Sequence, residues 1–221
     1  MYFDKPLHIL PRAFVSAGPS IPGLGFAVAS VHEGPPLAAT DEERRLARTM
    51  PRARGSDFLI GRSALHRAVR AAGLTAGAVL RDGPRPLLPG GIAGSISHSC
   101  GIAVAVAGPS DRFAALGIDL ELTPLPARAA HLVLRAAEQP LLGSTATEAR
   151  CLSVLHSAKE AAYKALCLLV EPAPRGLRDI TLVPDRDGFL AAAAVRPGVR
   201  VRVSVRRLPR GGVLCWALPP G

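Results

Sequence analysis

The eleven residues His156-Ser157-Ala158-Lys159-Glu160-Ala161-Ala162-Tyr163-Lys164-Ala165-Leu166 carry two of the three lysines of this 221-residue chain. Apart from Lys5, arginine supplies all of the remaining Lys and Arg charge. A lysine ammonium is a compact charge that can approach a phosphate and release a proton, whereas a guanidinium stays protonated. The stretch therefore indicates a site that needs ammonium chemistry, and it lies within a helix that we predict from about residue 147 to residue 169.

The apolar residues of this predicted helix fall on one side. At helical spacing they form a stripe of Leu152, Leu155, Ala162, Leu166 and Leu169. Glu160 and Lys164 lie together on nearly the opposite side, with His156, Ser157 and Tyr163 at its flanks. An exposed pair of this kind is common on any helix and adds only a few tenths of a kcal/mol. The uneven distribution of lysine favours a functional site over that simpler interpretation.

A second polar pattern lies about forty residues earlier, in Leu116-Gly117-Ile118-Asp119-Leu120-Glu121. The period of two in a strand puts the apolar residues on one face and Asp119 with Glu121 on the other, roughly 6–7 Å apart along the strand. Like charges so close repel unless a cation lies between them. Carboxylate oxygens are ligands that suit Mg²⁺. The alternative is a strand that simply ends in solvent before Thr123-Pro124.

His98 lies between two serines in Gly94-Ser95-Ile96-Ser97-His98-Ser99, which we expect to be a loop before a strand. A histidine there could donate to a phosphate, helped by the backbone N–H groups of the same segment. A local hydrogen-bonded role is the alternative.

The remaining pattern predicts an α+β chain with strands and one or two helices in each half. Helices are expected from Thr40, over 56–72, 127–142 and 147–169, and strands over 24–31, 101–107, 114–121, 178–183, 188–195, 199–207 and 212–218. The stretch from Gly83 to Gly91 is rich in Pro and Gly and is expected to be a loop. The turn at 109–112 divides the chain into an N-terminal half, 1–110, and a C-terminal half, 111–221, that carries the paired carboxylates.

Composition limits the compartment and the partners. Apolar residues make up 48% of the chain and charged residues 20%, which is typical of a globular protein. The four cysteines show no pairing or metal-ligand spacing, so we expect free thiols. No targeting or membrane-spanning segment is evident, and we expect a cytoplasmic protein without membrane contact. A net charge of +10 indicates an acidic partner, but aromatic residues are too few for stacking on single-stranded nucleic acid.

Four motifs, taken in their order, resemble those of the 4′-phosphopantetheinyl transferases, most of all the larger pseudo-dimeric class of the enterobactin-synthetase-component type. They are Gly61-Arg62-Ser63-Ala64-Leu65, Gly94-Ser95-Ile96-Ser97-His98-Ser99, Gly117-Ile118-Asp119-Leu120-Glu121, and Ser157-Ala158-Lys159-Glu160-Ala161-Ala162-Tyr163-Lys164, with Glu138 in a helical segment before the last. The resemblance covers residues 52–166. One departure is His156, which stands where an aromatic residue often precedes the last motif.

The resemblance implies two similar α+β halves, each a small, mostly antiparallel sheet packed with one or two helices, and it implies that coenzyme A and Mg²⁺ bind at the seam between them. By motif position the metal ligands would be Asp119, Glu121 and Glu160, and Lys164 would face the pyrophosphate. The contacts to coenzyme A would come from Arg54, Arg62, Ser97 and His98, with Arg85 and Pro86 in the loop that lines the adenine.

The activity that the resemblance implies is transfer of phosphopantetheine from coenzyme A to a serine of an acidic acyl or peptidyl carrier protein, with release of 3′,5′-ADP. Glu160 could act as a metal ligand or as the general base, and the sequence leaves both roles open. A monomer is expected, and the carrier could serve siderophore, polyketide or peptide synthesis. The alternatives are a basic protein that binds nucleic acid or another polyanion without catalysis, and an enzyme for another phosphorylated substrate.

Overall fold

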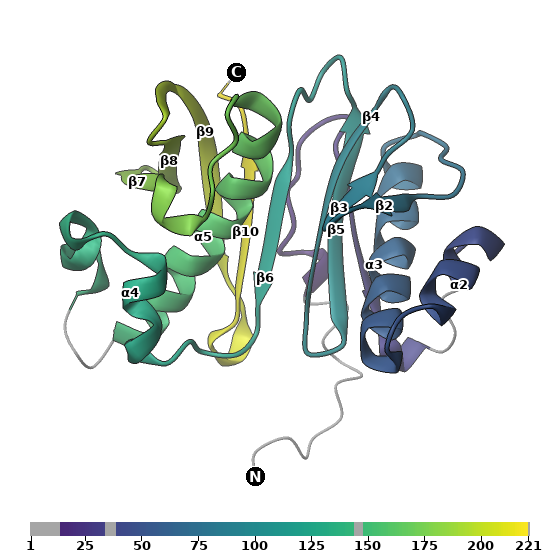
Figure 1. Ribbon diagram of the computed structural model, residues 1–221, viewed down its shortest axis with the longest axis horizontal. Helices are drawn as coiled ribbons and strands as arrows, with labels where there is room; N and C mark the ends of the chain where they lie inside the picture. Colours follow the sequence, from purple (N-terminus) through teal and green to yellow (C-terminus); the bar gives the residue numbers. More distant parts are fainter. Residues whose placement is uncertain (1–13, 34–38, 144–147, 221) are drawn as a thin grey trace, which may run out of the picture.

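The computed structural model describes residues 14–33, 39–143 and 148–220. The first thirteen residues of the predicted N-terminal half and the predicted helix start at residue 147 lie outside this part of the chain. The described residues form four layers in the order helix, sheet, sheet, helix, and Figure 1 shows helices α3 and α5 on the two outer sides.

The first sheet has three antiparallel strands in the order β1-β5-β4. They are β1 (Gly25–Ser30), β5 (Ile102–Pro109) and β4 (Ile92–Ser99). The long helix α3 (Arg52–Ala71) covers the outer face of this sheet, and α2 (Asp41–Arg48) packs against α3. Thr40 caps α2 through a reciprocal hydrogen-bonded box with Glu43, which confirms the helix start predicted from the sequence.

The second sheet has five antiparallel strands in the order β6-β10-β9-β8-β7. They are β6 (Gly117–Glu121), β10 (Val213–Leu218), β9 (Arg196–Arg207), β8 (Gly188–Ala193) and β7 (Ile180–Asp185). Helix α5 (Glu148–Leu169) covers the outer face of this sheet. Its predicted apolar stripe is buried, with Leu152, Leu155 and Leu166 at most 2% exposed.

A third apolar core lies between the two sheets. Alternate residues of β5 and β10 supply it, so that Val104 and Trp216 point inward while their neighbours face the helices. Because each sheet is covered on both faces where the two meet, the inner strands read as nearly continuous apolar runs. The two halves therefore pack through a shared hydrophobic layer.

The halves are built alike. In each, an edge strand is followed by a long helix, a hairpin and two more strands, so β1-β5-β4 corresponds to β6-β10-β9. Glycine stands at the same place in both edge strands: a Cβ on Gly25 would lie 1.9 Å from the Ala68 carbonyl oxygen, and one on Gly117 would lie 1.9 Å from the Ala161 carbonyl oxygen. The helix thus packs directly on the strand backbone in each half, and the predicted α+β pseudo-dimer is confirmed.

A buried acid is repeated as well. Glu43 bonds His66 of α3 at 2.9 Å and accepts from the Val79 amide, while Glu138 bonds Lys159 of α5 at 2.6 Å and accepts from the Leu182 amide. His66 and Lys159 each lie two residues before the alanine that contacts the glycine of the edge strand. No repeat in the sequence reveals this correspondence, because the residue that pairs with the acid differs between the halves, His66 in one and Lys159 in the other.

Three local predictions are wrong. Residues 127–142 form short pieces, η3 (Ala127–Ala129), α4 (Ala130–Val133) and η4 (Ala136–Leu142), because Leu134 is extended and η4 contains Pro140. The expected loop at 83–91 contains half of a hairpin, β2 (Leu80–Asp82) with β3 (Arg85–Leu87), which tolerates Pro86 because each of its strands has a free edge. His98 belongs to strand β4 and not to a loop.

Short 3-10 turns complete the description: η2 (Val31–Glu33), η5 (Leu177–Asp179) and η6 (Pro209–Gly211). Of the helices described, none is long and apolar enough to cross a membrane.

Candidate active site

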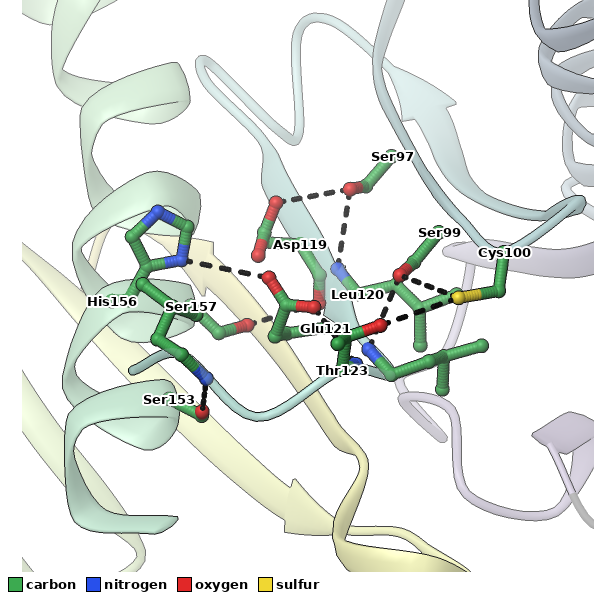
Figure 2. Close-up of polar contacts among 12 residues, drawn as sticks. Ser97, Ser99, Cys100, Asp119, Leu120, Glu121, Thr123, Ser153, His156 and Ser157 are labelled. Carbon is green, nitrogen blue, oxygen red and sulfur yellow. Dashed lines mark hydrogen bonds and ion pairs between the residues drawn. The ribbon is translucent and has the colours of Figure 1, made fainter. Parts of the chain in front are cut away.

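The two sheets meet where the edge of β6 approaches β4, and three serine side chains of β4 make the connection. The hydroxyls of Ser95, Ser97 and Ser99 accept hydrogen bonds from the amides of Ile118, Leu120 and Leu122, at 3.1, 3.2 and 3.2 Å. The serines alternate along β4 and the amides alternate along β6, so the contacts form a regular ladder of side chain to backbone. Figure 2 shows the bonds that Ser97 and Ser99 accept from the backbone amides, together with their other contacts. We call this feature the serine ladder.

Asp119 lies at the centre of this seam and is only 7% exposed. Its Oδ1 atom accepts from Lys164 Nζ of α5 at 2.8 Å and from the Ser97 hydroxyl of β4 at 2.9 Å. Lys164 Nζ also donates to the Ile118 carbonyl at 2.9 Å. One carboxylate oxygen therefore receives donors from both halves of the molecule. Lys164 is paired with Asp119, so the alternative of a solvent-exposed Glu160–Lys164 pair is wrong.

Glu121 also faces α5, but at His156 and not at Lys164. Its Oε1 accepts from the Thr123 amide at 3.0 Å, and its Oε2 lies 3.9 Å from Nδ1 of His156. That Nδ1 atom is buried and has no hydrogen-bond partner among the described residues. Figure 2 shows the imidazole directed at the Glu121 carboxylate. The two carboxylates of β6 are thus placed on the same strand but held by different partners.

Glu160 is half-buried on α5, one turn before Lys164, and in the described part of the chain no residue pairs with it. Within the same residues, no group of three or more His, Cys, Asp or Glu side chains is close enough to hold a metal ion. The predicted ligands Asp119, Glu121 and Glu160 all belong to β6 and α5. Their oxygen donors are of the kind that a hard divalent cation takes, so the chemistry of the set fits Mg²⁺.

Four of the residues predicted to contact coenzyme A line one groove of about 550 Å³ beside this seam, namely Arg54, Arg62, Pro86 and His98. The start of α3, the β2–β3 hairpin and β4 supply its walls. Arg81 adds a third guanidinium, whereas Asp57 is the one acid in the lining and lies 3.9 Å from Nδ1 of His98. The groove is therefore suited to an anionic ligand.

Arg62 is a structural part of this groove. Its side chain is stacked on Phe58 at 4.3 Å and donates to the carbonyls of Val79 and Leu80, next to the hairpin. It is 6% exposed, and this burial lowers the pKa of the guanidinium to about 10. Much of its hydrogen-bonding capacity is already used within the protein.

Two further predicted residues lie elsewhere. Arg85 is exposed on β3 and is close enough to α5 for its charge to act on Tyr163, whose phenol has a raised pKa because it is partly buried. Ser97 is buried in the seam, where its hydroxyl bonds Asp119.

The structural role of Lys159, the other lysine of the motif, was not predicted from the sequence. Lys159 is completely buried, and its ammonium bonds Glu138 at 2.6 Å and the Val133 carbonyl at 3.0 Å. It stabilises the junction of α5 with η4 and is not available to a ligand. The serine ladder was also missed, although the spacing of Ser95, Ser97 and Ser99 was a visible signal for a strand with one polar face.

Comparison with known proteins identifies the family of the chain. Residues 41–108 match the family model described as the 4′-phosphopantetheinyl transferase N-terminal domain, and residues 115–209 match the model of the 4′-phosphopantetheinyl transferase superfamily. The chain is 31% identical to enterobactin synthase component D of Salmonella typhi over 153 residues, which cover 67% of this chain and 63% of that protein.

A solved structure, the holo-[acyl-carrier-protein] synthase of Thermotoga maritima, is similar over 48% of this chain and 63% of its own, with a TM-score of 0.38 and 16% identity. Two family models occupy successive halves, the first ending in β5 and the second beginning just before β6. The chain belongs to the 4′-phosphopantetheinyl transferase superfamily.

Proposed function

We propose that this protein transfers the 4′-phosphopantetheine group of coenzyme A to a serine of an acyl or peptidyl carrier protein and releases 3′,5′-ADP. The observation that carries this proposal is the Asp119–Lys164 pair at the seam, with a groove rich in arginine beside it. An acid for a metal, an ammonium for a phosphate and a cationic groove for a nucleotide are the parts that such a reaction needs.

The groove takes the nucleotide end of coenzyme A in this proposal. Arg54 of α3 and His98 of β4 are exposed and both line the groove, so both can meet phosphate oxygens. Arg62 holds the hairpin that carries Pro86 through its bonds to the Val79 and Leu80 carbonyls. Its buried guanidinium adds positive charge to the lining of the groove. Arg85 and Lys164 then extend the positive charge toward the pyrophosphate.

In this proposal the metal ligands are Asp119 and Glu121 of β6 and Glu160 of α5. Bound Mg²⁺ would neutralise charge that develops on the pyrophosphate oxygens. In the structure the Lys164 ammonium holds Asp119 Oδ1. Pairing Lys164 with a phosphate oxygen releases that carboxylate, so binding of coenzyme A and binding of the cation favour each other.

The reaction forms a bond between the serine oxygen and the β-phosphorus and breaks the bond from that phosphorus to the bridging oxygen. Glu160 makes no hydrogen bond or ion pair within the described residues, so one of its two carboxylate oxygens can bind the cation while the other accepts the serine proton. Lys164 stabilises the departing phosphate. The net charge of +10 attracts acidic carriers and speeds their encounter.

The finer assignments follow from the same proposal. One chain supplies both sides of the seam, so a monomer suffices, and the turn at 109–112 is the boundary between its halves. We place the enzyme in the cytoplasm, where coenzyme A is available. The name of the relative from Salmonella typhi makes carriers of siderophore synthesis the first to test.

The test is to incubate the protein with coenzyme A, Mg²⁺ and several apo carrier proteins and to measure carrier mass. Addition of one phosphopantetheine supports the proposal. Failure with every carrier, together with salt-dependent binding to nucleic acid, would support the polyanion-binding alternative instead.

A further inference from the structure

The hydroxyl of Ser97 makes two hydrogen bonds that differ in kind. A serine hydroxyl has a single hydrogen to donate and two lone pairs to accept with. The hydrogen goes to Asp119 Oδ1 at 2.9 Å, and a lone pair accepts the Leu120 amide at 3.2 Å. Ser97 is 8% exposed and Asp119 is 7% exposed, so water does not readily replace either bond.

The other two members of the serine ladder provide an internal comparison. Ser95 and Ser99 accept amides of β6 in the same way, at 3.1 and 3.2 Å, but neither hydroxyl contacts a carboxylate. Ser99 instead lies 3.9 Å from the sulfur of Cys100. The contact with Asp119 therefore belongs to Ser97 alone within the ladder.

Two donors of different origin meet at Asp119 Oδ1. Lys164 comes from α5 in the C-terminal half, and Ser97 comes from β4 in the N-terminal half. In the described residues no donor bonds to Oδ2. Two donors on one oxygen restrict rotation of the carboxylate group and keep the other oxygen free. If Lys164 leaves for a phosphate, Ser97 is the donor that still orients the group.

We propose that Ser97 is a positioning residue: from the N-terminal half it orients the Asp119 carboxylate of the C-terminal half so that Oδ2 is presented to a divalent cation. This inference rests on the proposed function, because that function supplies the cation. It also assigns the Ser97 hydroxyl to Asp119 and not to coenzyme A. Contact between the two halves therefore contributes to metal binding as well as to the packing of the halves.

The expected loss of metal affinity can be judged from similar hydrogen bonds in other metal sites. Loss of a hydrogen bond that orients a metal-ligating carboxylate typically lowers metal affinity by about 10- to 100-fold. Loss of an amide acceptor in the ladder lowers stability but does not reorient Asp119. The two effects can therefore be separated by comparing serines of the same ladder.

The experiment measures Mn²⁺ binding to the purified protein by electron paramagnetic resonance, without coenzyme A or carrier. Three variants are compared with the wild type: Ser97→Ala, the matched control Ser95→Ala, and Ser97→Thr, which keeps the hydroxyl. We expect Mn²⁺ affinity to fall about 10-fold or more in Ser97→Ala, to stay near that of the wild type in Ser95→Ala, and to recover in Ser97→Thr. If Ser97→Ala does not fold, Ser97→Cys takes its place, because a thiol of similar size is a weak donor.

The outcomes separate the inference from the proposed function. A wild-type protein that transfers phosphopantetheine, with equal Mn²⁺ affinities in Ser97→Ala and Ser95→Ala, overturns the positioning role and leaves the function intact. A wild-type protein that neither binds Mn²⁺ nor transfers overturns both.

Discussion

Lys164 Nζ lies 2.8 Å from Asp119 Oδ1, and this pair joins the C-terminal part of α5 to the middle of β6 at the seam. The lysine is about one quarter exposed, while the aspartate side chain is 9% exposed. The ammonium at Oδ1 and a metal cation at Oδ2 would share one carboxylate, so the two positive charges oppose each other's binding. This competition yields the first prediction.

Replacing Lys164 by Met should raise the affinity of the protein for Mn²⁺ in the absence of coenzyme A, because the competing ammonium is gone. The same change should abolish transfer, since no ammonium remains to stabilise the leaving phosphate. Without metal, the unpaired carboxylate should lower the free energy of unfolding by roughly 1–3 kcal/mol. Metal titration and urea unfolding, each with and without Mn²⁺, provide the measurements. Unchanged metal affinity in Lys164→Met would contradict the competition.

Unlike the Asp119–Lys164 pair, the buried Lys159–Glu138 pair should affect stability and not metal binding. Lys159→Met leaves a buried carboxylate without its cation and should lower the free energy of unfolding by about 3–5 kcal/mol. The double variant Lys159→Met/Glu138→Gln should regain part of this loss, because the charge is removed with its partner. Neither should change Mn²⁺ affinity while the protein is folded. If Lys159→Met abolished metal binding at temperatures where its circular dichroism matched that of the wild type, Lys159 would belong to the site.

Acid should destabilise the N-terminal half through Glu43. Burial alone would raise the pKa of this carboxyl, but hydrogen bonds from His66 and from the amides of Val79 and Thr40 outweigh it and hold the pKa below its ordinary 4.5. A lowered pKa in the folded state stabilises the protein above pH 4.5 and loses this effect as the pH falls. Urea unfolding between pH 6 and 3, roughly the range over which the carboxyl titrates, should show a smaller loss of stability in Glu43→Gln than in the wild type. If the free energy of unfolding fell equally with pH in both proteins, Glu43 would not be the cause of the acid destabilisation.

Of the three arginines that line the groove, Arg54 should prove to be a ligand contact and Arg62 a structural residue. Arg54 is exposed, so Arg54→Ala should weaken binding of 3′,5′-ADP without changing thermal stability. Arg62 is buried against the hairpin and Phe58, so Arg62→Ala should lower thermal stability as well as ligand affinity. Calorimetry with 3′,5′-ADP and thermal unfolding distinguish the two. Equal stability losses in both variants would mean that the groove wall depends on Arg54 too.

The cysteines should differ sharply in reactivity. Cys100 is exposed in the turn after β4, whereas Cys215 lies fully buried beneath Asp119 in β10, and burial raises the pKa of its thiol to about 12. At mildly alkaline pH, a disulfide reagent should label Cys100 quickly and Cys215 only after unfolding. Mass spectrometry of the labelled peptides gives the order, and rapid labelling of Cys215 in the folded protein would show that the seam opens.

Much of the fold could be predicted from the sequence because its signals are local. Thr40 and Glu43 form a capping box, the apolar stripe of α5 has helical spacing, and the strands of the second half alternate. The segment before α5 is broken at the extended Leu134, and Glu138 beyond it turns inward to a lysine on another helix. That contact is tertiary, so no spacing in the segment reveals it.

The site could be predicted as a set of residues but not as a geometry. Asp119 and Lys164 were both expected at the seam from their motifs, yet their ion pair requires the register of β6 against α5. Helical spacing puts Lys164 on the face of Glu160 and Lys159 beside the apolar stripe, but it does not predict that Lys159 is completely buried. The serine ladder requires two strands of different sheets to meet at their edges, which no pattern within either strand reports.

The central claim is that Asp119 and Lys164 serve phosphopantetheine transfer. The most direct measurement follows, in one reaction with coenzyme A, Mg²⁺ and an apo carrier protein, both the mass of the carrier and the release of 3′,5′-ADP, for the wild type and for Asp119→Asn. We expect the wild type to add one phosphopantetheine for each 3′,5′-ADP released, and Asp119→Asn to keep its fold but to show neither product. Transfer by Asp119→Asn at the wild-type rate, or 3′,5′-ADP release without any gain in carrier mass, would contradict the claim.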